Sequence, residues 1–424
     1  MSGFAHPSPA YRRFCILAAI SVLIVNLTFM TGTAFADNRN AMARAADQLT
    51  GMQLPSGLFE YEYNFLTGEE TDKANVTNPN MVRQADAAFA LAGYYALAPS
   101  PELRESLLAT LNEFARLSLP IGRGPVQDIV QKLRVLSLPY GRRTLQRFMN
   151  WSDLLYTRGG DGRVISPDGA YESAWVGSTA LALLAEIRYS KASGDTQFAK
   201  HRDAWLRGLL SLRIPGRGFR AAPHHISEME FFNGESWFAL ATYIDFDPNN
   251  AAVAGALETL DDHLMQRYAD PWNILFYSWG MMAAERRYAT TRDEKFLSFI
   301  VFQTKAYLEH LKPAPDGKQR VNCAGLEGLV SARRVLGAHV IKFPNLVKRL
   351  NDLINTELPK NLSRQVRPGQ NRIDLGGGAY LSSSRLSGYA GAFLESIANP
   401  VTRIDLTGHC LSAMMMLESM PADD

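Results

Sequence analysis

Hydrophobic segments rich in small residues recur six times along the chain, each directly after a short polar or glycine-containing stretch. They begin near residues 83, 172, 233, 277, 323 and 407. A helix that is apolar on all sides must be buried against other helices. The pattern therefore predicts six buried helices, each of which needs a more solvated partner.

Amphipathic segments between these stretches fit the role of solvated partners. The first places apolar residues at helical spacing, at Leu103, Leu107, Leu108, Leu111, Phe114 and Ala115. The others are residues 196–212, 251–268, 293–311 and a shorter one at 346–353. This alternation predicts a mainly all-α fold in which helix hairpins close into a ring. The loops before the inner helices would converge on a funnel.

Short strands are expected only as decorations. Residues 58–63 alternate apolar and acidic side chains, which suits a short strand with one aromatic face. Residues 162–165 and 379–381 have similar character.

The first residues have the features of an export signal. Arg12 and Arg13 precede an apolar run at 14–30, and Ala34 and Ala36 provide the small residues that a signal peptidase reads. This predicts a signal peptide over residues 1–36 and a periplasmic or secreted protein. An uncleaved anchor is the alternative, but the run is shorter than the roughly 20 residues that a bilayer span requires.

Composition narrows the class of protein further. The chain has 44 basic and 42 acidic residues, and it has no second hydrophobic span. This balance excludes an integral membrane protein and a protein recruited to nucleic acid by bulk charge. Because no low-complexity linker divides the chain, we expect one domain over residues 37–424, with a basic insertion at about 119–150.

Two cysteines follow the predicted signal peptide, Cys323 and Cys410, at the starts of the fifth and sixth buried segments. Neighbouring helices of a ring could join them by a disulfide in an oxidising compartment. The alternative is two small buried hydrophobic residues. Neither has a second Cys or His at the close spacing of structural zinc sites, so no metal site is expected.

Acidic residues near the helix starts are candidates for catalysis. A buried helix start favours acidic side chains, and Glu172, Glu230, Glu235 and Glu327 lie at or near such starts. Two carboxyl groups facing each other across a funnel are what glycosidic bond hydrolysis requires. Glu235 and Glu327 are the strongest candidates, because their tight, apolar contexts would raise their pKa values. Capping of the helices is the alternative role.

Aromatic and basic residues gather in the same stretches. Trp237 and Tyr277 could stack on sugar faces, although packing between the two barrels would also use such rings. Arg83 and Arg220 could bind carboxylates or sulfates of an acidic glycan, or could simply be surface charges.

The last buried segment begins with Arg403, Asp405 and His409. Asp405 could orient the imidazole of His409 as an acid or base. Alternatively, Arg403 and Asp405 could form a structural ion pair that closes the last hairpin onto the first. No cofactor is predicted.

The chain resembles bacterial six-hairpin (α/α)6 toroid proteins, which are similar to polysaccharide hydrolases and lyases and to the helical domain of glucuronyl C5-epimerases. The resemblance covers roughly residues 54–417 and rests on the aromatic strand at 59–63 and on four segments. These are Asn80-Met-Val-Arg-Gln-Ala, Asn233-Gly-Glu-Ser-Trp, Gly325-Leu-Glu-Gly and Arg403-Ile-Asp-Leu-x-x-His. The resemblance to lyases and epimerases implies Tyr63, Tyr277 and His409 as groups that move a proton beside a uronic carboxylate.

Together these features predict an exported protein that acts on a cell-envelope or extracellular polysaccharide. A carbohydrate-active enzyme of hydrolase, lyase or epimerase type is the leading hypothesis. The alternative is a non-catalytic glycan-binding or scaffold protein of a polysaccharide synthesis and export system, since a toroid can keep its groove without catalysis. A terpene-type cyclase is disfavoured by the signal peptide and by the absence of an Asp-rich cluster.

Overall fold

The computed structural model describes residues 38–70, 80–122, 160–214, 216–225, 227–311, 321–376, 378–396 and 399–420. The predicted signal peptide at 1–36 lies outside these residues. So does most of the predicted insertion at 119–150, of which only the first few residues are described.

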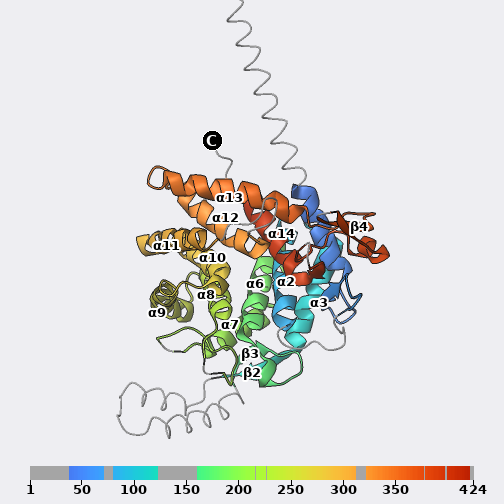
Figure 1. Cartoon of the computed structure of the whole chain (residues 1–424). Coiled ribbons are helices and arrows are strands. Elements are labelled where there is room, and N and C mark those ends of the chain that lie inside the picture. The colour runs from blue at the N-terminus through green and yellow to red at the C-terminus, as the bar shows by residue number, and fades with distance from the viewer. Residues whose placement is uncertain are drawn as a thin grey trace, which may run out of the picture.

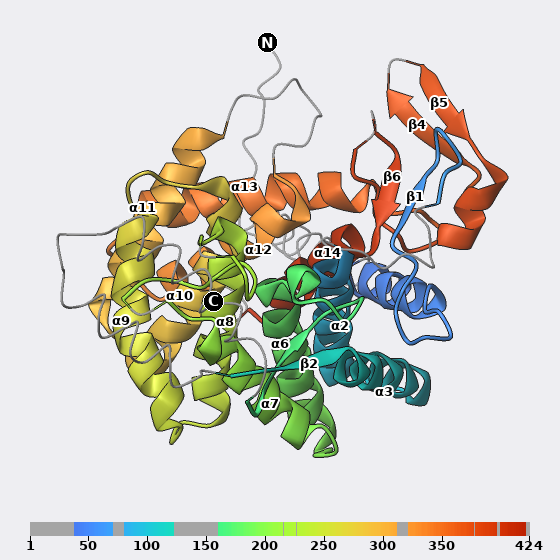
Figure 2. The ribbon, with the colours of Figure 1, turned by 90° about the horizontal axis from the view of Figure 1, so that it is seen from below.

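Helices dominate the described residues, and six of them form the inner ring (Figures 1 and 2). They are α2 (Asn80–Leu97), α6 (Val176–Ser193), α8 (Glu230–Phe246), α10 (Ile274–Thr291), α12 (Cys323–Gly337) and α14 (Ile404–Glu418). Each packs on the next in this order, and α14 packs back on α2. The ring is therefore closed, which confirms the predicted toroid of helix hairpins.

Burial on all sides accounts for the composition of the inner helices. In α6 every residue from Val176 to Ile187 is buried. Small residues allow these helices to approach closely: a Cβ atom added to Gly234 of α8 would lie 2.7 Å from the Cβ atom of Trp279 of α10. Small and apolar residues are therefore what a helix surrounded by other helices requires.

Amphipathic helices form the outer layer, as predicted. They are α3 (Pro101–Arg116), α7 (Ala199–Ser211), α9 (Ala251–Arg267), α11 (Glu294–His310) and α13 (Pro344–Leu362). The predicted limits of α13 were too short. Its buried residues continue past Leu353 to Ile354 and Glu357, and Pro359 is tolerated close to the helix end.

The sequence pattern missed a further outer helix at residues 38–51, directly after the predicted cleavage site. Ala41, Ala45 and Leu49 are buried at helical spacing. Arg39 forms an ion pair with Glu418 at the end of α14, and Arg44 donates hydrogen bonds to Gln365. The helix therefore connects the beginning of the described chain to its end.

Three antiparallel strand pairs decorate the described part of the toroid. They are β1 (Glu62–Asn64) with β6 (Val401–Arg403), β2 (Ser118–Ile121) with β3 (Gly162–Ile165), and β4 (Arg372–Gly376) with β5 (Ala379–Ser382). In the first pair Tyr63 lies opposite Thr402, which places Arg403 and the start of α14 beside the first strand. Over the described ranges, no helix has both the length and the hydrophobicity to cross a membrane.

Candidate active site

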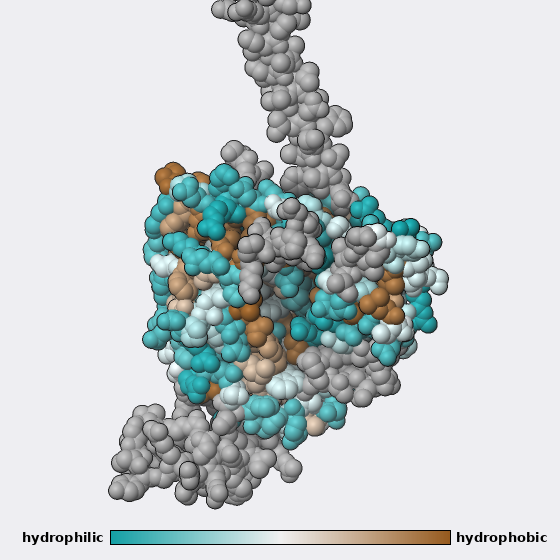
Figure 3. Space-filling model, in the orientation of Figure 1, coloured by the Kyte–Doolittle hydropathy of each residue, from teal (hydrophilic) through white to brown (hydrophobic). Residues whose placement is uncertain are grey.

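A cavity of about 1110 Å³ lies where the inner helices begin. Figure 3 shows a hollow near the middle of one face, with hydrophilic and hydrophobic patches around it. Residues from α2, α8, α10, α12 and α14 line the cavity, together with the segments beside β6. Its wall has apolar and aromatic side chains, including Phe231, Phe232, Ile274, Leu275, Trp279 and Phe393. Its polar side includes Arg83, Glu235, Arg364, Arg403, Asp405 and His409.

His409 lies within a network of buried acids at the base of this cavity. Its Nδ1 atom lies 2.7 Å from Oε2 of Glu327, and its Nε2 atom lies 3.6 Å from Oδ2 of Asp86. Burial alone would lower the pKa of His409, but the charges of Asp86 and Glu327 raise it to about 10. The imidazole is therefore protonated at neutral pH, with a carboxyl group on each side.

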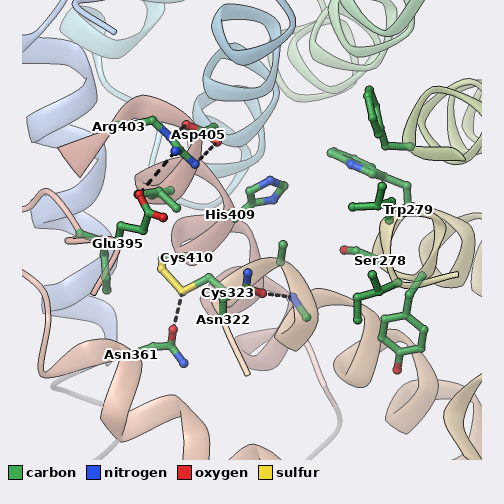
Figure 4. A pocket seen from close by; sticks show the side chains of 18 of the residues that line it. Ser278, Trp279, Asn322, Cys323, Asn361, Glu395, Arg403, Asp405, His409 and Cys410 are labelled. Atoms are coloured by element: carbon green, nitrogen blue, oxygen red, sulfur yellow. Dashed lines mark hydrogen bonds and ion pairs between the residues drawn. A yellow bond between two sulfur atoms is a disulfide. The ribbon is translucent and has the colours of Figure 1, made fainter. Parts of the chain in front are cut away.

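Asp405 is held in the ionised state by two arginines. Arg403 approaches it with two nitrogen atoms, at 3.0 and 3.2 Å (Figure 4). Nε of Arg83 lies 3.5 Å from Oδ2 of Asp405. Burial would raise the pKa of Asp405, but the arginines hold it below its usual value. Because Arg83 belongs to α2, its contact with Asp405 joins the first inner helix to the last. The Arg403–Asp405 pair itself lies within β6 and α14.

Glu235 of α8, in contrast to Asp405, is protonated at neutral pH. Its side chain is buried, with 2% of the residue exposed, and its Oε2 atom has no hydrogen-bond partner. Burial raises the pKa of Glu235 to about 8, against the opposing charge of Arg83. Oε2 lies against Gly177 of α6 so closely that a Cβ atom there would overlap it. A protonated carboxyl group thus lines the cavity at neutral pH.

Cys323 and Cys410 form a disulfide that lines the same cavity. It joins the first residue of α12 to the middle of α14, so it links the two helices that carry Glu327 and His409. In Figure 4 the bridge lies beside His409 and Asn361. Of the two readings of these cysteines, the structure therefore has the disulfide.

The structure brings five of the predicted site residues to the cavity wall. They are Glu235, His409, Arg83, Tyr277 and Asp405. Of the two arrangements considered for Asp405, the ion pair with Arg403 is present, while the hydrogen bond of His409 joins it to Glu327.

The other predicted residues do not line the cavity. Glu327 is fully buried behind His409, where its carboxylate has an imidazole to pair with. Tyr63 packs in a separate cluster, stacked on Tyr389 with ring centroids 4.9 Å apart. Trp237 is buried and donates from Nε1 to Asp261, because its helix turns that face toward α9. Arg220 lies in the segment before α8 and is 8% exposed.

Asp86, which belongs to the buried network around His409, was missed by the sequence reasoning. It lies three residues after Arg83 within the apolar helix α2, and 3% of it is exposed. Burial raises the pKa of Asp86 to about 7, although the charge of His409 opposes this shift. A single acid within an otherwise apolar inner helix is the signal that could have identified it.

No group of three or more His, Cys, Asp or Glu residues within the described ranges has an arrangement that could hold a metal ion. The polar groups of the cavity can instead donate protons and bind anions. A protonated Glu235 can donate, an ionised Asp405 can accept, and three arginines line the same space.

No family model matches the sequence, and no curated protein matches it. Solved structures do match its fold. A sugar epimerase from a ruminal bacterium has a TM-score of 0.56 and 12% identity, and the match covers 92% of this chain and 100% of that one. An unsaturated glucuronyl hydrolase specific for heparin has a TM-score of 0.54 and 11% identity, covering 90% and 96% of the two chains.

An inactive variant of an α-1,6-mannanase from a Salegentibacter species, in complex with α-1,6-mannotetrose, is also similar. Its TM-score is 0.51 at 10% identity, and the match covers 89% of this chain and 98% of that one. At these identities the likeness shows that the chain has the (α/α)6 toroid fold.

Proposed function

We propose that this protein is an exported carbohydrate-active enzyme that hydrolyses a glycosidic bond in a cell-envelope or extracellular polysaccharide, with Glu235 as the general acid. The observation that carries the proposal is the state of Glu235. It is a buried carboxyl group that lines the cavity, has an unpartnered oxygen and keeps its proton near neutral pH. A general acid that protonates a leaving oxygen needs this state.

The second carboxyl group that hydrolysis requires is Asp405. Glu235 and Asp405 line one cavity, and their pKa values are shifted in opposite directions. Such a pair separates the roles of acid and base or nucleophile. The positive charge of Arg83 acts to lower the pKa of both carboxyl groups, so it links their protonation. Asp405 is thus the candidate base or nucleophile.

Hydrolysis is favoured over elimination or epimerisation because those reactions require a base that removes a carbon-bound proton. His409 has a pKa raised to about 10, so it already carries a proton at neutral pH. Burial raises the pKa of Tyr277 well above its ordinary value, and Tyr63 does not line the cavity. None of the three is therefore a ready base. His409 is better suited to fixing Asp86 and Glu327.

The cavity wall supports a sugar substrate. Ile274 and Leu275 are 46% and 55% exposed and line the cavity beside Trp279. Apolar and aromatic surfaces of this kind stack on the apolar faces of sugar rings, while arginines bind their polar groups. The solved mannanase structure of the same fold contains an oligosaccharide, which is consistent with this use of the toroid.

Export is the part of the proposal that rests on sequence alone. The basic and apolar start of the chain and the Ala34–Ala36 site support cleavage before Asp37 and a periplasmic or secreted location. A disulfide between Cys323 and Cys410 fits an oxidising compartment. Envelope or extracellular polysaccharides are the glycans that such a protein would meet.

The test is product release from a panel of neutral and acidic polysaccharides in water labelled with heavy oxygen. Hydrolysis places the label at the new reducing end, elimination gives an unsaturated unlabelled product, and epimerisation cleaves nothing. We expect labelled products from the wild-type protein and at least a roughly hundredfold loss in Glu235→Gln. Glu172→Gln, which changes an exposed acid outside the cavity lining, is the matched control.

If the protein binds a glycan without releasing products, and Glu235→Gln binds it with the same affinity, the enzyme hypothesis is wrong. The protein would then be a glycan-binding or scaffold protein. Release of unsaturated products would show that the protein is an enzyme, but that it catalyses elimination and not hydrolysis.

A further inference from the structure

The cavity has a second polar end, at the first turn of α12, that the proposed acid pair does not use. Asn322, Cys323, Ala324 and Gly325 line the cavity there, and Arg364 and Tyr277 line it as well. Asn322 caps the helix by accepting a hydrogen bond from the Gly325 amide. α12 runs for 15 residues, so its start carries the positive end of a full helix dipole.

Contacts around Asn361 bring the start of α12 close to α13. The side chain of Asn361 donates to the carbonyl of Val321, the second residue before the helix. Arg364 follows Asn361 by three residues and donates from Nη1 to the carbonyl of Glu395. The guanidinium therefore lies in the wall between the disulfide and the segment before β6.

Arg364 is the unbalanced charge of this wall. Arg83 and Arg403 contact Asp405, and Arg403 also lies 3.5 Å from Glu395. Among the described residues, Arg364 forms a hydrogen bond to a carbonyl but no ion pair with a carboxylate. Glu357, whose charge it feels, is bonded to Lys360 and to the Val321 amide. Holding a half-buried guanidinium without a counterion costs free energy, and an anionic ligand would supply that counterion.

Tyr277 supplies an independent sign of a missing partner. The residue is 1% exposed and lines the cavity, and its hydroxyl has no hydrogen-bond partner. Its ring packs directly on α12, where a Cβ atom added to Gly328 would lie 2.5 Å from Cε1. It also stacks on Tyr307 at 4.1 Å between ring centroids. Buried hydroxyls are normally bonded, so this one has a hydrogen-bonding capacity that no described residue uses.

We propose that the first turn of α12, Arg364 and the Tyr277 hydroxyl form an anion subsite that binds the carboxylate or sulfate of an acidic sugar unit. This inference rests on the proposed function and names its substrate class: the glycan is acidic. The oxyanion would accept hydrogen bonds from the guanidinium and the phenol while the helix start stabilises its charge. The subsite does not use Glu235 or Asp405, the two groups assigned to the bond that is cleaved.

Binding of small sugars tests the subsite without any reaction. Calorimetry would compare glucuronic acid, its methyl ester, glucose 6-sulfate and glucose with the wild-type protein. We expect one or both anionic sugars to bind about tenfold or more tightly than the neutral ones. Preference for glucuronic acid alone assigns a carboxylate, and preference for glucose 6-sulfate alone assigns a sulfate ester.

Substitutions at Arg364 and Tyr277, with one control, locate the subsite. Arg364→Gln should remove the preference for anions, Arg364→Lys should retain most of it, and Arg367→Gln, the same change at an exposed neighbouring arginine, should leave it intact. Tyr277→Phe should weaken anion binding several-fold without lowering the melting temperature, because the lost hydroxyl has no partner in the free protein.

Equal affinity for charged and neutral sugars, no binding of either anion, or an unchanged preference in Arg364→Gln would overturn the inference. These outcomes are independent of the proposed hydrolysis, because labelled product from neutral polysaccharides would still identify a hydrolase. If the wild-type protein gives no labelled product but still prefers anionic sugars, the proposed hydrolysis is wrong and the anion subsite stands.

Discussion

Nδ1 of His409 and Oε2 of Glu327 lie 2.7 Å apart, between the last and the fifth inner helices. Glu327 is fully buried and does not line the cavity, so the imidazole is the group that presents this pair to the cavity. Asp86 approaches the other nitrogen from α2. One imidazolium therefore connects three helices of the ring.

Neutralising Glu327 should show how much its pairing with His409 contributes to the stability of the fold. Glu327→Gln leaves a buried imidazole with one acid in place of two, and we expect a loss of about 3 kcal/mol in the free energy of unfolding. The pKa of His409 should fall because one of the charges that raise it is gone. Urea unfolding and NMR titration of the imidazole measure the two effects. A loss no larger than in Glu172→Gln, with unchanged titration, would contradict the pairing.

The disulfide should stabilise the ring closure. Cys323 and Cys410 are separated by 87 residues in sequence, and closing a loop of this length contributes on the order of 4 kcal/mol through the unfolded chain. Reduction, or the double change to serine, should therefore lower the melting temperature and loosen α12 against α14. Thermal unfolding with and without reductant measures the change in melting temperature. Identical curves would show that the disulfide does not stabilise the fold.

Gly177 should be intolerant of a side chain for a local reason. Alanine there would overlap Oε2 of Glu235 and lie 2.7 Å from Cδ1 of Phe232, so the carboxyl group must move. We expect a loss of product release of about hundredfold, since small displacements of catalytic groups are costly. Gly255→Ala is the control: nothing lies within 4 Å of the added atom, and alanine favours the helix by up to about 1 kcal/mol. Equal activity of both variants would remove Glu235 from the mechanism.

The proton on Glu235 also predicts how stability depends on pH. The unfolded chain loses this proton near pH 4.5, whereas the folded protein keeps it up to about pH 8. The folded state binds more protons between these limits, so rising pH favours unfolding. Glu235→Gln should flatten the decline of melting temperature from pH 5 to pH 8. A parallel decline in both proteins would mean that Glu235 ionises at its ordinary pKa.

Much of the fold could be predicted because burial on all sides and amphipathic spacing are properties of single segments. The inner helices belong to this class, and so does the position of Arg83 near the start of one of them. The pairing of Glu327 with His409, 82 residues apart, depends on which helices become neighbours. The burial of Trp237 depends on which face of α8 meets α9. Arg364 lies in an arginine-containing loop with no distinguishing local pattern, so only the assembled cavity identifies it.

The central claim is that Glu235 donates the proton to the leaving group, and it is tested most directly by varying that group. Kinetics of Glu235→Gln would be compared on the cleaved glycan and on an aryl glycoside of the same sugar with a strongly acidic phenol. The account predicts about a hundredfold or greater loss on the glycan and near wild-type glycosidic bond cleavage on the aryl glycoside, which needs no acid. An equal loss on both substrates, or none on either, would contradict it.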